Sequence, residues 1–103
     1  MNLQIQPGDK REIAETLGRY FEANKMPFHI EEKGNGTLYI GFQVDGHQSS
    51  VTVSFDSAAY DAFTQWDAEQ KRVALTRIGH DFERLMKRRS DAALAGEFHI
   101  NRF

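Results

Sequence analysis

Apolar residues near the start of the chain recur at spacings of three and four, the period of an amphipathic helix. The apolar face consists of Ile13, Leu17, Tyr20 and Phe21. The run from Asp9 to Glu12 has the form of a capping box, in which the Asp9 side chain accepts from the Glu12 amide. The pattern therefore predicts a helix that begins at Asp9 and ends near Asn24.

Polar and apolar residues then alternate over three stretches, which is typical of strands buried on one face. The apolar positions are Phe28, Ile30, Leu38, Ile40, Phe42, Val44, Val51, Val53 and Phe55. Asp45-Gly46 suits a two-residue type I′ turn, and Gly34-Asn35-Gly36 suits a three-residue loop. Hairpins closed at these turns place every apolar residue on the same face, whereas a one-residue slip would set apolar against polar. We therefore expect a meander with Ile40 opposite both Ile30 and Val51.

Helical spacing returns after the third stretch. Asp56 or Ser57 can cap a short helix, and Asp67 either starts a new helix or lies within this one. The stripe of the short helix is Ala59, Ala62, Phe63 and Trp66. The stripe of the following long helix, over about 68–93, is Leu75, Ile78, Phe82, Leu85 and Met86. A helix of this length must overhang the sheet, cross it diagonally or break, and Gly79 is the natural break point because glycine is unfavourable inside a helix.

Two further strands are predicted at the ends of the sequence. Phe98 and Ile100 alternate with polar residues after Gly96, which indicates a final strand, and the run 3–5 indicates a short one. The elements predict an α+β fold, a two-layer sandwich with the helices on one face of a largely antiparallel sheet. Their order is helix, three-stranded antiparallel meander, long helix or helix pair, and final strand. The 103 residues fit a single domain spanning 1–103.

Composition narrows the function classes. The chain has no cysteine, which excludes disulfides and thiolate chemistry, and its net charge of -2 gives no general attraction to nucleic acid or anionic membranes. No stretch approaches the roughly 18 apolar residues of a membrane span. We expect a cytoplasmic protein that does not associate with membranes.

Catalytic and metal-binding motifs are missing from the sequence. No nucleophile elbow, paired-histidine zinc motif or phosphate-binding loop occurs, so we expect neither an enzyme nor a cofactor. His29 and His99 fall on the polar face of the predicted sheet. If their strands were neighbours, the two rings could approach each other near Glu31 and bind a metal. Zinc sites normally have closely spaced ligand pairs, so we expect no metal here.

Charge is unevenly distributed over the second half of the chain. The range 56–69 carries four acidic residues and no Lys or Arg, whereas the range 71–89 is rich in bases. The candidate anion-binding residues in it are Arg77, Arg84, Lys87, Arg88 and Arg89. One interpretation is that acids and bases match the dipole of a helix. The other is an end of the molecule that binds nucleic acid.

The order helix, three strands, helix is similar to that of the double-stranded RNA-binding domain. That resemblance implies basic residues at the start of the second helix, where this sequence has Asp56 and Asp61 instead. With its further strand, the order also resembles bacterial secretion-chaperone folds, which bind proteins. Both resemblances concern topology, which does not determine function.

A small non-enzymatic protein-binding or regulatory module, such as an inhibitor, adaptor or immunity-type protein, is the function we expect. Its partner, of unknown identity, would bind the polar sheet face. The candidate binding residues there are His29, Tyr39, Gln43, Thr52 and His99. Nucleic-acid binding by the 77–89 surface is the alternative, and a small enzyme comes third. We also expect a homodimer if the long helix overhangs the sheet and exposes Leu85, Met86 and Leu94.

Overall fold

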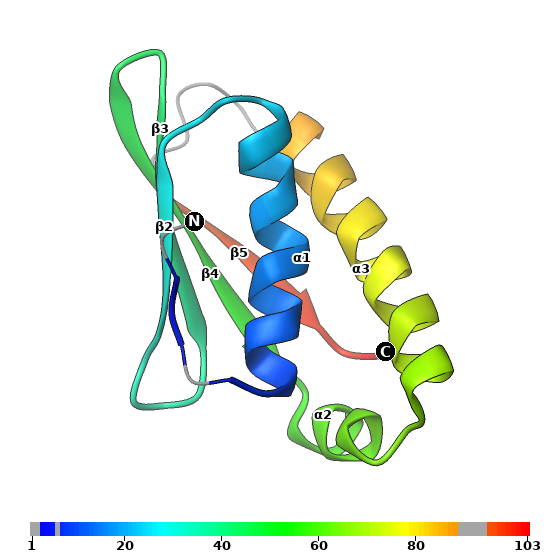
Figure 1. The fold of residues 1–103 in the computed structure, drawn as a ribbon. Coiled ribbons are helices and arrows are strands. Elements are labelled where there is room, and N and C mark those ends of the chain that lie inside the picture. Colours follow the sequence, from blue (N-terminus) through cyan, green and yellow to red (C-terminus); the bar gives the residue numbers. More distant parts are fainter. Residues whose placement is uncertain (1–2, 6, 89–94) are drawn as a thin grey trace.

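The computed structural model describes residues 3–5, 7–88 and 95–103, which form the predicted α+β fold (Figure 1). Its elements are β1 (Leu3–Gln4), α1 (Asp9–Ala23), β2 (Phe28–Glu32), β3 (Leu38–Val44), β4 (His47–Phe55), α2 (Ser57–Thr64), α3 (Ala68–Arg88) and β5 (Ala95–Ile100). The helices lie on one side of the sheet, and α1 and α3 run beside each other across it.

Over the described residues, the five strands form one sheet in the order β1-β2-β3-β4-β5. The central pairs are antiparallel in the predicted register, with Ile40 opposite both Ile30 and Val51. Asp45 and Gly46 have φ angles of 51° and 79°, as a type I′ turn requires. The outer strands β1 and β5 are instead parallel to their neighbours, so the complete sheet is mixed.

The core fills the space between the sheet and the helices. Phe42, Val53, Ile78 and Phe82 were expected to be buried, and each is at most 2% exposed. Phe21 of α1 connects the two layers, because its ring lies 4.9 Å from that of Phe42 and 5.8 Å from that of Phe82. Aromatic packing of this kind contributes beyond simple area burial.

The helix starts differ in part from the prediction. Helix α1 is capped by Gly8 without a side-chain bond, and the Asp9 carboxylate accepts from Lys71 of α3 at 2.9 Å. The expected capping box is therefore wrong, because this ion pair takes the carboxylate. A reciprocal cap occurs instead at α3. The main-chain N–H of Gln70 donates to the Asp67 carboxylate, and the main-chain N–H of Asp67 donates to the side-chain oxygen of Gln70. Asp56 caps α2 as predicted.

Gly79 does not break the long helix. Helix α3 is continuous from Ala68 to Arg88, and the rest of the predicted helix, in 89–94, lies outside the described residues. A Cβ atom at position 79 would lie 3.2 Å from Cγ2 of Thr16 in α1. The glycine therefore permits a close approach of α1 and α3 instead of marking a kink.

The predicted exposed stripe is also wrong. Met86 is buried and Leu85 packs against the core, while Leu94 lies outside the described residues. The reason is that β5 extends the sheet beneath α3, where Phe98 contacts Phe82. Ala62, assigned to the apolar stripe of α2, is exposed. Among the described residues, the exposed large apolar side chain is that of Val73, at 58%.

Candidate functional site

The sheet has one face that no described residue covers, because the helices lie on the other (Figure 1). Strand register sets the outward side chains of this open face in rows. The middle row runs Glu31, Tyr39, Thr52, Glu97 from β2 to β5. The candidate residues Tyr39 and Thr52 are therefore direct neighbours at the centre of the face.

His29 and Gly41 form a neighbouring row on β2 and β3. The imidazole of His29 lies over the glycine so closely that a Cβ atom at position 41 would come within 2.4 Å of the ring. A ring that covers a cross-strand glycine shields its backbone and fixes the ring position. His29 is thus held flat on the open face, with its ring centroid 6.0 Å from that of Tyr39.

A cation also lies close to the Tyr39 ring. Lys33 Nζ lies 5.0 Å from the centroid of the Tyr39 ring and 2.7 Å from a carboxylate oxygen of Glu31. The hydrogen bond from Lys33, together with its charge, lowers the pKa of Glu31 below its ordinary value. The Tyr39 ring is therefore near both His29 of β2 and Lys33, which follows β2.

His99 lies on the other side of the face. Its Nδ1 atom is 2.8 Å from Ser54 Oγ of β4. The possible approach of His29 and His99 does not occur, because β3 and β4 separate their strands. No group of three or more His, Asp and Glu side chains within the described part of the chain is arranged to hold a metal ion.

Small hydroxyl side chains occupy β4 between the two histidines. Ser50, Thr52 and Ser54 alternate along its outward side. Gln43 extends the face at the end of β3 opposite Gln48, and its side chain is exposed. The face as a whole combines the rings of His29 and Tyr39 with hydrogen-bonding groups and a row of short hydroxyl side chains on β4. This arrangement suits contact with a flat surface.

Most of the described basic candidates have local partners. Arg77 donates to the main-chain oxygens of Arg102 and Phe103. Arg84 pairs with Asp81, and Lys87 pairs with Glu83 at 2.8 Å. Arg88 is exposed, and Arg89 lies outside the described residues. The hydrogen bond and charge of Glu83 raise the pKa of Lys87, and the hydrogen bond and charge of Lys87 lower the pKa of Glu83.

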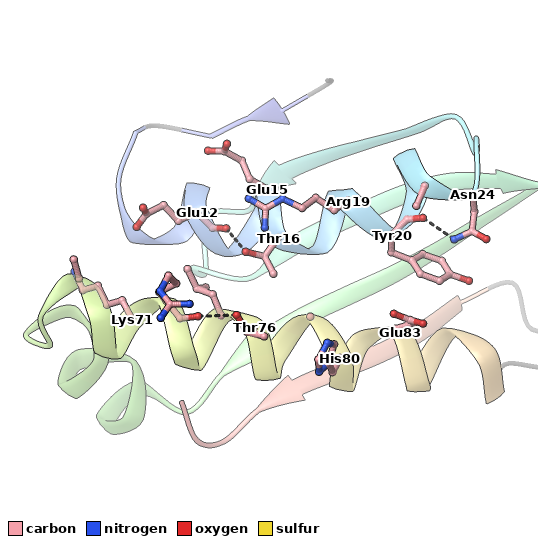
Figure 2. Close-up of a pocket in the computed structure, with 15 residues that line it drawn as sticks. Glu12, Glu15, Thr16, Arg19, Tyr20, Asn24, Lys71, Thr76, His80 and Glu83 are labelled. Atoms are coloured by element: carbon pink, nitrogen blue, oxygen red, sulfur yellow. Dashed lines mark hydrogen bonds between the residues drawn. The ribbon is translucent and has the colours of Figure 1, made fainter.

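Sequence reasoning missed a groove of about 870 Å³ between α1 and α3 (Figure 2). Gly79, which the sequence suggested as a break point of the helix, is one of the residues that line it. Acidic and basic side chains from both helices line it, and its hydroxyls bond locally, Thr16 to the Glu12 carbonyl and Thr76 to the Arg72 carbonyl. Within the described residues, no buried titratable group lies along its lining. The groove therefore offers a mixed polar and apolar surface without convergent chemistry.

The class defined by this geometry is an α+β fold whose mixed sheet is covered by helices on one face and open on the other. No family model, no curated protein and no solved structure matches the chain. Among the described residues, each helix is too short or too polar to cross a membrane. Function must accordingly be argued from the surfaces themselves.

Proposed function

We propose that this protein is a small protein-binding module with a regulatory role, as an inhibitor or adaptor, and that the open sheet face contacts its partner. The observation that carries the proposal is the combination of an uncovered sheet face with two held rings, His29 over Gly41 and Tyr39 beside Lys33. Held rings give contact area at little conformational cost.

The composition of the face indicates the chemistry of the partner. Glu31 is neutralised by Lys33, whereas Glu97 is exposed on the outermost strand without an ion-pair partner among the described residues. The hydroxyls of β4 offer donors and acceptors over a flat area. The matching surface is therefore flat, rich in hydrogen-bonding groups and positively charged opposite Glu97.

A second copy of the chain fits this face poorly. A two-fold axis along the strands, through the centre of the face, would place Glu31 of one copy over Glu97 of the other. An axis across the strands would place each glutamate of the middle row over its own counterpart. The second arrangement opposes the two Glu97 carboxylates, which are unpaired among the described residues, and the first sets Glu97 against a glutamate that is already paired with Lys33. Neither gives Glu97 a positive partner of its own, which favours a different protein as the partner.

Photo-crosslinking in cells tests the proposal without knowledge of the partner. A photoreactive phenylalanine analogue is placed at Thr52 or Gln43 on the open face, and at Arg72 or Val73 on α3 as matched controls. We expect a crosslinked heterologous protein from the face positions only, and its loss from position 43 when Thr52→Arg is added. Crosslinks from α3 alone, from no position, or only between two copies of the chain would refute the proposal.

Nucleic-acid binding, the alternative, gains no support from the geometry. Arg84 and Lys87 are paired with acids on their own helix, and Arg77 is engaged by main-chain oxygens. These pairings leave only a small surplus of positive charge, whereas a duplex needs a row of net positive charge along its phosphates. Tight, salt-dependent binding of a nucleic-acid duplex would reverse this preference.

A further inference from the structure

A second surface lies at the edge of the sheet, beside α3. A groove of about 410 Å³ separates the helix from β5, and Arg77 and Asp81 line its helix side. Thr76, Gly79 and Glu83 line the groove on the α1 side of the same helix. The smaller groove is therefore on the far side of α3 from α1, next to the outer edge of the sheet.

The main chain of β5 is open along this edge. The carbonyl of Ile100 accepts from the Asp56 amide at 2.9 Å, so the main chain of Ile100 points toward β4. Because main-chain direction alternates along a strand, the N–H and C=O groups of Glu97 and His99 point away from β4. Both residues are exposed, and no partner for these groups occurs within the described part of the chain.

The groove beside this edge has a positive surplus. Arg77 and Arg102 line it together with a single acid, Asp81. Arg84 and Arg88 follow Arg77 by seven and eleven residues, which returns them to nearly the same side of the helix. The side chain of Glu97 is on the opposite, open face and does not offset these bases. Phe98 and Ile78 add an apolar floor.

We propose that an extended, acidic segment of a partner protein adds as a strand to the outer edge of β5, with its acidic side chains toward the arginines of α3. Exposed edge groups bind such segments through the main chain, and the neighbouring surface selects their side chains. This surface differs from the open sheet face, so the two proposals stand or fall separately. A second copy is disfavoured here. A two-fold axis perpendicular to the sheet, which would pair β5 with β5 of a second copy, places both α3 helices on the same side and brings both sets of arginines together.

Peptide binding followed by NMR tests the inference. The probe is a six-residue peptide of alternating glutamate and valine, and the control peptide has lysine in place of glutamate. We expect the acidic peptide alone to shift the amide signals of Glu97 and His99, to leave Gln43 unchanged, and to bind more weakly as salt is added. Equal binding of both peptides, or of neither at millimolar concentration, would overturn the inference.

Two variants separate strand addition from simple charge attraction. Glu97→Pro removes an outward N–H without breaking the ladder to β4, and it should weaken binding about tenfold. Its matched control, Glu97→Gln, loses the same charge, keeps the N–H, and should bind as the native chain does. Arg88→Glu, which leaves the strand intact, should weaken binding about threefold. The proposal would be contradicted if both Glu97 variants lost peptide affinity equally, or if Arg88→Glu lost none. It would also be contradicted if the native chain were a dimer that Glu97→Pro dissociates.

Discussion

The contact between Gly79 and Thr16 makes the sharpest test of the helix packing. Alanine at position 79 would gain about 1 kcal/mol of intrinsic helix stability over glycine. Its Cβ atom would also lie 3.2 Å from Cγ2 of Thr16, a methyl group held in place because the Thr16 hydroxyl donates to the Glu12 carbonyl. Overpacking of a filled interface costs about 1–3 kcal/mol, and this overlap belongs at the low end.

We therefore expect Gly79→Ala alone to change the free energy of unfolding by less than about 0.5 kcal/mol, because gain and overlap nearly cancel. Thr16→Ser removes the opposing methyl group and keeps the hydroxyl. In that background, Gly79→Ala should stabilise the protein by about 1 kcal/mol. Urea denaturation followed by the fluorescence of Trp66, the single tryptophan, measures all four proteins of the cycle.

Additivity is the result that would refute this reasoning. If Gly79→Ala gains its full helical propensity with Thr16 in place, the two helices are not in contact at this position. Gly79→Val provides a control, since its branched side chain enlarges the overlap and should destabilise the protein in both backgrounds. A stable Gly79→Val protein would likewise contradict the close approach of α1 and α3.

Three further predictions concern the sheet, the core and metals. Gly46→Val should destabilise the protein by about 1–3 kcal/mol, because a β-branched residue resists the φ angle of this turn, and an unchanged melting temperature would show the turn to be wrong. Phe82→Ala should cost about 3–5 kcal/mol in urea denaturation, whereas a loss below about 1 kcal/mol would place Phe82 outside the core. Zinc or a chelator should leave the melting temperature unchanged, and a zinc-dependent shift lost in His29→Ala would contradict this.

The meander could be predicted residue by residue because two independent signals constrain it. The alternation of Leu38, Ile40 and Phe42 fixes which face is buried, and the Asp45-Gly46 turn fixes where the strand reverses. Each signal alone permits a slip, but a slip that satisfies both does not exist. The neighbours Tyr39 and Thr52 of the candidate site follow directly from this register.

Caps and strand order depended on contacts between distant residues. Asp9-x-x-Glu12 and Asp67-x-x-Gln70 have the same capping form. At the start of α1, however, the Asp9 carboxylate pairs with Lys71, so of these two sequences the one before α3 forms the capping box. Likewise, nothing local to Phe98 or His99 states which strand β5 joins. The helices between β4 and β5 allow a parallel crossover, which places the two strands side by side and carries His99 away from His29.

The basic residues of α3 show how the two sequence interpretations combine. Arg84 and Lys87 pair with acids one turn before them, as expected for bases that match the dipole near the end of a helix. Such exposed pairs are weak and exchange readily, so they leave a net positive surface in place. In the proposed strand addition, that surface has a role because β5 brings an open edge beside it. Helix stabilisation accounts for the presence of these bases, and binding at the edge, if the peptide test succeeds, accounts for their position.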